Sequence, residues 1–296
     1  MATLKELKGR IGSVASSEKI TGAMKMISSA KMHKAEGALR RLVPFRSQIE
    51  VIIANLLSSD AEFSSPLVTA ADEVRNITII VWGSDDGLCG AYNVNIYKEL
   101  IARLGQLRQE HPQASVTVVA IGRKMLAAAS HLHLANVTVT AAPQGIDSKT
   151  EGQTVDNFTT GLVSDFSHGH VDMMQVLYMR YISAGRQRPT AKQLLPVVPQ
   201  EIAAAGKDVR TGRPYLFEPD PNSIFNAVLP LFLMSTVQDI FTENRASEQA
   251  ARVMAMQAAN DNAKNLLDDL QLEYNKLRQQ SITSELLDIV GGQVRE

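Results

Sequence analysis

The residues that could do chemistry gather in one glycine-rich loop. The segment Gly83 to Gly90, Gly-Ser-Asp-Asp-Gly-Leu-Cys-Gly, follows an apolar run typical of a buried strand. A loop in this position can hold a phosphate with its backbone amides. Its glycine spacing, however, fits neither a dinucleotide-binding fingerprint nor a Walker loop. Asp85 and Asp86 would also repel a phosphate, so we predict a tight turn that packs a helix on a strand, and no cofactor.

Cysteine and histidine offer two further kinds of site. Cys89 is the single cysteine of the chain, and its neighbours form no triad-like motif, so a buried structural thiol is favoured over a nucleophile. The pairs His131-x-His133 and His168-x-His170 have ligand-like spacing but lack a cysteine or a reliable carboxylate partner. We therefore expect solvated loop histidines, no metal site and no catalytic residue.

Composition narrows the class of protein. The 296 residues are 45% hydrophobic and carry a formal charge of -1, which gives no general attraction to nucleic acid. A lone cysteine fits a reducing compartment. No apolar run approaches the roughly 18 residues of a membrane span, and charged residues interrupt the first leucines, unlike an export signal. We expect a soluble, intracellular protein that can work beside a membrane.

The middle of the chain, residues 74–200, alternates strands and helices. Two apolar runs, Ile77 to Trp82 and Val116 to Ile121, each end in glycine and resemble buried parallel strands. Further strands are expected at 137–140, 175–182 and 193–198, and helices at about 91–104, 123–129 and 154–166. The pattern predicts a small doubly wound, mainly parallel α/β domain of about five strands. Residues 59–73 and 199–221 read as connectors.

The sequence patterns at both ends of the chain predict long helices. Residues 222–290 contain no glycine and no proline after Pro230, so one helix of roughly 100 Å can run the whole way. Asn222 or Ser223 could cap its start, and Gly291-Gly292 should end it. Apolar or small residues recur at alternating steps of four and three, as in a coiled coil, at Ala263, Leu267, Leu270, Tyr274 and Leu277.

Residues 1–58 supply the partner helix. Thr3 to Glu6 reads as a capping box. Two apolar seams follow, at Leu4, Leu7, Ile11 and Val14 and at Ala38, Leu42, Phe45, Ile49, Ile52 and Leu56. A compact insert between the two helices favours an antiparallel coiled coil, in which Leu56 lies near Asn222 and Leu4 opposite about Tyr274.

About 20 residues would then extend beyond the first helix as an apolar tip. A lone apolar helix needs a sheath, or else it folds back on its own body. The first helix also carries a basic flank that includes Lys25, Lys31, Arg40 and Arg41. Such a flank is a solvated face or the contact for an acidic protein partner; nucleic acid is disfavoured because stacking aromatics are missing from it.

Several characteristic segments occur in order along the whole chain, and the most specific lie in the terminal helices. They are Arg10-Ile11 with Lys19 to Ile27, Asp86 to Asn93, Ser247 to Gln257, Asp261 to Ala263, Tyr274 to Lys276 and Ile282 to Leu286. With these segments the chain resembles the gamma subunit of F-type ATP synthases. The chain departs from the family at Asp86 and at Gly22, where Lys or Arg is usual.

The resemblance implies a non-catalytic rotor subunit of a bacterial-type complex. The coiled coil would be the central shaft inside a ring of alternating alpha and beta subunits, and its foot would stand on the epsilon subunit and the ring of c subunits. Proton flow would turn the shaft and drive the beta subunits through the conformations that make ATP, and hydrolysis would reverse this. The complex would lie at the cytoplasmic face of a bacterial membrane, with this chain attached peripherally.

By the same similarity, two groups of residues would contact partners. Contacts with the alpha and beta ring would involve Met24, Lys25, Arg252, Gln257, Ile282, Leu286, Leu287 and Ile289. Contacts with epsilon and the c ring would involve Tyr215, Leu216, Phe217 and Glu218. The alternative is a nucleotide-dependent α/β enzyme with helical dimerisation arms, which micromolar binding of ATP or ADP to the isolated chain would favour.

Overall fold

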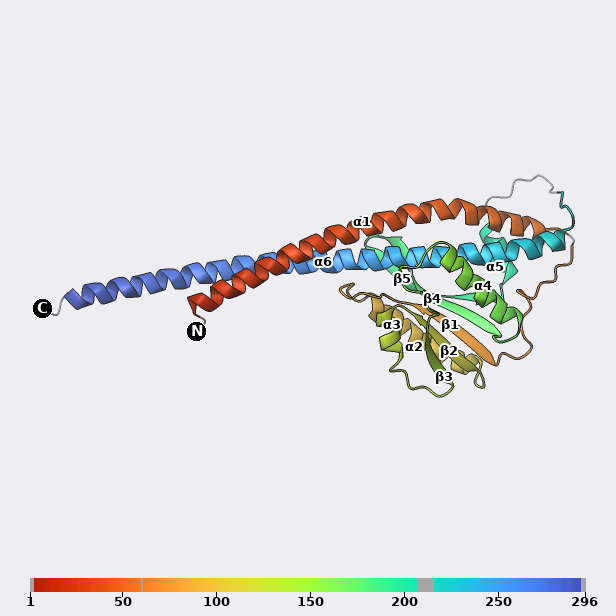
Figure 1. Ribbon diagram of the computed structural model, residues 1–296, viewed down its shortest axis with the longest axis horizontal. Helices are drawn as coiled ribbons and strands as arrows, with labels where there is room; N and C mark the ends of the chain where they lie inside the picture. Colours follow the sequence, from red (N-terminus) through yellow and green to blue (C-terminus); the bar gives the residue numbers. More distant parts are fainter. Residues whose placement is uncertain (1–2, 60, 207–215, 294–296) are drawn as a thin grey trace. The chain divides into compact units, whose positions relative to one another are not determined.

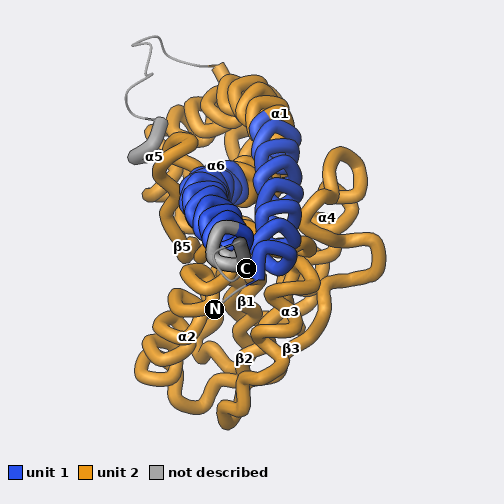
Figure 2. Tube along the Cα trace, turned by 90° about the vertical axis from the view of Figure 1, so that its left-hand side faces the viewer, with its two compact units in different colours: residues 1–29, 252–296 blue, residues 30–251 orange. Residues whose placement is uncertain are grey.

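The computed structural model describes residues 3–59, 61–206 and 216–293. It divides into two compact units, of which unit 1 comprises residues 1–29 and 252–296 and unit 2 comprises residues 30–251 (Figure 2). The long helices α1 (Leu4–Leu57) and α6 (Pro221–Gln293) each contribute to both units. The sheet belongs entirely to unit 2 (Figure 2).

The start of α1 is the predicted capping box. The amide of Glu6 donates to Thr3 Oγ1 at 3.3 Å, and the amide of Thr3 donates to the Glu6 carboxylate at 2.9 Å. These two bonds satisfy amides that have no partner within the first turn.

Both predicted ends of α6 are wrong. Its cap is Asp220, not Asn222 or Ser223, because Asp220 accepts hydrogen bonds from the amide and the hydroxyl of Ser223 at 2.9 and 2.6 Å. Pro221 takes the first helical position, where a proline loses no hydrogen bond. At the other end the helix continues through Gly291 and Gly292 to Gln293.

Unit 2 is built on a five-stranded sheet of order β3-β2-β1-β4-β5. The first four strands are parallel, and β5 pairs antiparallel with β4. This confirms the mainly parallel α/β fold with long terminal helices. The strands are β1 (Asn76–Trp82), β2 (Ser115–Ile121), β3 (Val137–Ala141), β4 (Met173–Ser183) and β5 (Arg186–Leu195).

Helices cover both faces of this sheet (Figure 1). Alternate residues of the buried strands point to opposite faces, so Ile79 and Ile80 enter different cores. On one face the sheet packs against α2 (Tyr92–Glu110) and α3 (Arg123–Ala129). On the other it packs against α4 (Gln153–Ser167) and the unit 2 parts of α1 and α6. There Trp82 meets Phe241 edge to face, with ring centroids 5.2 Å apart.

Polar contacts join α1 to its neighbours within unit 2. The Arg46 guanidinium donates to the Asp239 carboxylate of α6 at 2.5 Å, and the Tyr181 hydroxyl of β4 donates to Glu36. Burial raises the pKa of Asp239 more than Arg46 lowers it. These contacts tie α1 to both α6 and the sheet.

Four further features differ from the sequence prediction. The fifth strand begins at Arg186, not at residue 193, and residues 199–206, expected as a connector, form helix α5 (Pro199–Gly206). In α1 the predicted seam residues Ile49 and Leu56 are buried, but Phe45 and Ile52 are exposed, and Ile53, outside the predicted seam, is buried instead. Within Pro221–Leu287 one 18-residue window has the length and hydropathy of a membrane span, but 56% of it is buried inside the protein, as in a core helix.

Candidate functional site

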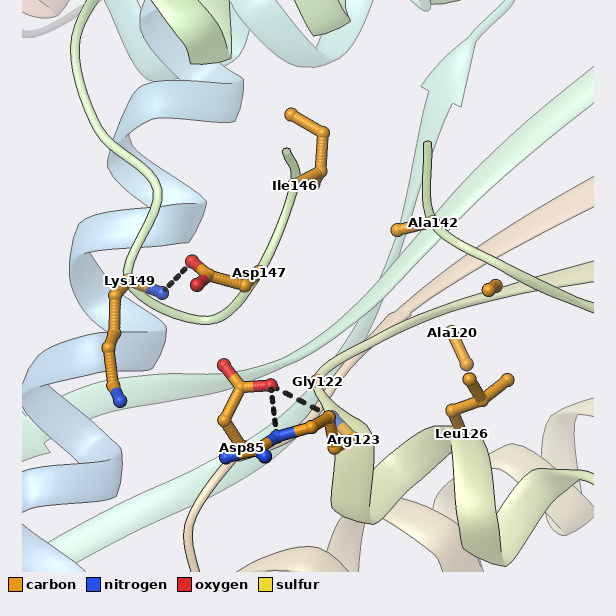
Figure 3. A pocket seen from close by; sticks show the side chains of 10 residues that line it. Asp85, Ala120, Gly122, Arg123, Leu126, Ala142, Ile146, Asp147 and Lys149 are labelled. Carbon is orange, nitrogen blue, oxygen red and sulfur yellow. Dashed lines mark hydrogen bonds and ion pairs between the residues drawn. The ribbon is translucent and has the colours of Figure 1, made fainter. Parts of the chain in front are cut away.

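A crevice of about 280 Å³ opens in unit 2 beside the carboxyl ends of β2 and β3 (Figure 3). Its wall combines Asp85 from the glycine-rich loop, Gly122 and Arg123 at the start of α3, and Lys149 from the loop after β3. Open α/β sheets commonly bind their ligands beyond the carboxyl ends of the strands. A nucleotide site, if the chain had one, would be expected here.

The carboxylate of Asp85 takes the place of an anion in this crevice. Its two oxygens accept hydrogen bonds from the amides of Arg123, at 2.9 Å, and Ser148, at 3.0 Å. Burial raises the pKa of Asp85, but the hydrogen bonds outweigh burial and hold the pKa below its usual value. Asp85 is therefore ionised at neutral pH, and it occupies two amides that a phosphate would need.

The carboxylate of Asp86 pairs with two cationic side chains nearby. Lys149 Nζ lies 2.9 Å from one carboxylate oxygen of Asp86, and the Arg123 guanidinium lies 3.4 Å from the other. The hydrogen bond to Asp86 raises the pKa of Lys149. Because carboxylates already face these amides and cations, the crevice gives no support to a nucleotide-dependent enzyme.

The glycine-rich loop is a tight turn, as predicted. Gly122 has a φ of +95°, and a Cβ there would lie 2.7 Å from the carbonyl oxygen of Gly83. At Gly83 a Cβ would lie 2.4 Å from Met125 Cβ of α3. Both positions need glycine because α3 packs directly on the loop that follows β1.

The cysteine and histidine candidates do not form a reactive site. Cys89 is a buried free thiol, with Ser84 Oγ at 3.6 Å and Asn93 Nδ2 at 3.4 Å. The rings of His168 and His170 stack with centroids 6.0 Å apart. Among the described residues, no three His, Cys, Asp or Glu side chains are grouped so that they could hold a metal ion.

Unit 1 pairs the start of α1 with the second half of α6. Asn260 Nδ2 donates to the carbonyl oxygen of Glu18 at 2.7 Å. This bond confirms the antiparallel register for unit 1, because the count that sets Leu4 opposite Tyr274 also sets Glu18 opposite Asn260. Leu7 of α1 and Leu270 of α6 are both buried.

The predicted ring-contact residues of unit 1 differ in accessibility. Met24 and Lys25 are half-buried, and Gln257 donates to the carboxylate of Asp261 one turn away. Arg252 is 6% exposed, so little of its side chain reaches the surface of the chain. These four predicted residues thus come from both helices of unit 1, and none of them is fully exposed.

Exposed apolar side chains in unit 1 were missed by the prediction. Ile20 and Ile27 stand seven residues apart on α1 and are 60% and 57% exposed, and Met26 is 68% exposed. Met254 of α6 is also exposed. Exposed large apolar groups mark surfaces for partners. Their spacing could have identified them, because they fall outside the apolar seam.

The tip of α6 is apolar and bare. Four predicted contact residues, Ile282, Leu286, Leu287 and Ile289, are between 47% and 66% exposed. The helix continues unbroken through them to Gln293, so α6 does not fold back. The predicted foot lies just before α6, where Leu216 is 86% exposed and Phe217 packs against the core of unit 2. Glu218 is exposed, and Tyr215 lies outside the described residues.

Comparisons with known proteins agree on one family. A family model described as ATP synthase matches residues 3–294. The ATP synthase gamma chain of Phocaeicola vulgatus is 37% identical over 294 residues, covering 99% of both chains. That of Chromobacterium violaceum is 36% identical over 292 residues, again covering 99% of both.

Solved structures support the fold. A chain in the mitochondrial ATP synthase of Euglena gracilis aligns with a TM-score of 0.63 at 20% identity, covering 98% of this chain and 93% of that one. A chain from the central stalk and c-ring of the Tetrahymena thermophila enzyme aligns with a TM-score of 0.54 at 21% identity, covering 81% of this chain and 99% of that one. The long terminal helices and the central sheet therefore recur together.

Proposed function

Because this chain belongs to the ATP synthase gamma-chain family, we infer that it is the central stalk of an F-type ATP synthase. It is a non-catalytic subunit of that membrane-associated complex. Its rotation couples proton flow to ATP synthesis and, in reverse, ATP hydrolysis to proton pumping. The crevice agrees with this role, since its amides and cations already face the carboxylates of Asp85 and Asp86.

The observation that carries the mechanical role is the bare tip of α6. Leu286 and Leu287 are 57% and 66% exposed on a helix that has passed the start of its partner α1. Leaving such apolar groups in water is unfavourable by roughly 25 cal/mol for each Å². A sleeve of other subunits removes this penalty, so the tip is proposed to rise inside the ring of alternating alpha and beta subunits.

The contacts with the ring are proposed to be of two kinds. Those at the tip are apolar and non-directional, which suits a shaft that visits equivalent orientations in turn. Those lower on the shaft involve Met24, Lys25, Arg252 and Gln257 together with the exposed apolar groups beside them. Complementary charge there favours acidic segments of the beta subunits and excludes wrong registers.

The foot of the shaft is proposed to contact epsilon and the c ring through the segment Tyr215 to Glu218. Leu216 supports this, because at 86% it is the most exposed large apolar side chain of the described residues. Phe217 packs against the core of unit 2 and anchors the segment. A foot on the c ring would place the chain at the cytoplasmic face of the membrane, as a peripheral subunit.

Co-purification tests the proposal. A tagged chain expressed with its own alpha and beta subunits should recover the hexamer. Leu287→Glu should lower the recovery several-fold, because it buries a charge in an apolar sleeve. Gln280→Glu, at another exposed position of the same helix, is the matched control and should leave recovery unchanged. Failure of the parent chain to recover any hexamer would contradict the stalk, and micromolar ATP binding to the isolated chain would favour an enzyme.

A further inference from the structure

A buried amide joins the two helices of unit 1. Asn260 of α6 is 7% exposed, and its Nδ2 donates to the Glu18 carbonyl of α1 at 2.7 Å. Thr21 Oγ1 lies 3.3 Å from the same nitrogen, and its hydroxyl lies 3.0 Å from the carbonyl oxygens of both Ser17 and Glu18. The contact therefore connects a side chain of one helix to a fixed point on the backbone of the other.

Gly22 gives this amide its room. A Cβ at residue 22 would lie 3.3 Å from Asn260 Nδ2, a close approach that the amide could accept only by moving a few tenths of an ångström. A Cβ at Gly9 or Gly12 of the same helix would meet nothing within 4 Å. Gly22 thus differs from Gly9 and Gly12, because the Asn260 amide packs against the position that a side chain at residue 22 would take.

The apolar seam around this contact is sparse. The buried large apolar side chains in the described part of unit 1 are Leu7, Met256 and Leu270. Apolar packing is non-directional and tolerates an axial shift, whereas a hydrogen bond to one carbonyl does not. A buried asparagine is a known means of fixing the register of a coiled coil.

We propose that Asn260, seated over Gly22, fixes the axial register of α1 and α6 in unit 1, so that the two helices turn together when the shaft carries torque. The mechanical half of this proposal rests on the stalk function inferred above. Asn260 is a positioning residue, because it acts by holding one helix against the other.

Cross-linking in the assembled complex measures the register directly. The register places Ala15 opposite Ala263, so the pair Ala15→Cys with Ala263→Cys should form a disulfide. Ala15→Cys with Leu267→Cys reports a shift of one helical turn. In the Asn260→Ala background the ratio of the first product to the second should fall at least threefold. Asn262→Ala, at an exposed asparagine two residues away, should leave the ratio unchanged.

Gly22→Ala supplies an independent arm. It should lower the same ratio when Asn260 is present and have no further effect with Asn260→Ala, because the crowded amide is then gone. Gly12→Ala is its control. An unchanged ratio in both Asn260→Ala and Gly22→Ala would overturn the proposal.

Activity separates this proposal from the function on which it rests. In membranes, Asn260→Ala should reduce ATP synthesis at least threefold while ATP hydrolysis stays within twofold of the parent. If the parent complex itself shows no coupled synthesis, the stalk function fails, although the cross-link ratio still reports the register. If the parent is coupled and Asn260→Ala synthesises ATP at the parental rate, the mechanical role of the contact is wrong.

Discussion

Replacing Asp85 by alanine should destabilise the central domain. The change leaves the amides of Arg123 and Ser148 without the carboxylate that now accepts from both, at 2.9 and 3.0 Å. A hydrogen bond to a charged group contributes about 1.5 to 3 kcal/mol. Water can enter the open crevice and replace part of this, so we expect a loss of about 2 to 3 kcal/mol in the free energy of unfolding. Asp85→Asn keeps one oxygen acceptor and should lose about half as much.

Trp82 provides the assay. It is the single tryptophan of the chain, is fully buried, and lies three residues before Asp85. Urea unfolding of the full chain, followed by tryptophan fluorescence, should show the midpoint of Asp85→Ala lowered by about 1 M, because slopes are about 1 to 3 kcal/mol per M.

The pH dependence of unfolding tests whether ionised Asp85 stabilises the fold. The pKa of Asp85 is lower in the folded chain than its unfolded value of about 3.9. Its stabilisation is therefore present above about pH 4 and is lost as the pH falls through the folded pKa. The gap between parent and Asp85→Asn should shrink below pH 4. Equal midpoints for parent and Asp85→Ala at pH 7, or a gap that widens on acidification, would refute the assignment.

Three further experiments test the remaining elements. Leu286→Ala at the tip should leave ATP turnover within a few-fold of the parent, since contacts in a rotating sleeve are shallow; abolished turnover in an assembled complex would make the tip a specific docking site. Lys25→Glu with Lys31→Glu should reduce proton pumping more than ATP hydrolysis, because complementary charge guides pairing with the beta subunits, whereas surface ion pairs contribute only about 0 to 1 kcal/mol each to stability; an equal loss of both activities would contradict the charge argument. Gly122→Ala should destabilise unit 2 by about 1 to 3 kcal/mol through backbone strain alone, and the clash of the new Cβ with Gly83 adds to this loss. Gly12→Ala, where a Cβ meets nothing within 4 Å, should instead stabilise its helix by about 1 kcal/mol. Thermal unfolding of the two variants measures both effects.

Local and periodic signals predicted much of the fold. The apolar runs at β1 and β2 can be read without knowing their partners, because strands buried on both faces are continuously apolar. The capping box at Thr3 is equally local. The hairpin of β4 and β5 was missed because β5 is an edge strand whose first residues, from Arg186 to Lys192, are mostly polar and include Pro189, as edge strands tolerate.

The seam of α1 failed where tertiary packing changes. A heptad pattern assumes one partner helix, but in unit 2 α1 packs on both α6 and the sheet side of the core, so Ile53 is buried and Phe45 is exposed. The pairing register of α1 with α6 also differs between the two units. Arg46 reaches Asp239, about two turns from the residue that the one-to-one count sets opposite it, so Leu56 near Asn222 does not follow from the register of unit 1.

The candidate site was predictable in type but not in detail. The bare tip followed from counting residues in two helices, whereas the two aspartates of the glycine-rich loop could be located from the sequence but their partners could not. The partners of Asp85 lie 38 and 63 residues away, and the seat of Asn260 depends on a glycine in the other helix. Such contacts depend on tertiary structure, which a single sequence does not display.

ATP-driven proton uptake into membrane vesicles tests the central claim most directly. Vesicles carrying the complete complex should acidify on addition of ATP, and vesicles stripped of the catalytic sector should do so only when alpha, beta, epsilon and this chain are all added back. Omitting this chain should abolish uptake, whatever hydrolysis the remaining subunits retain. ATP-driven uptake at the full rate in its absence would contradict a central stalk made by this chain.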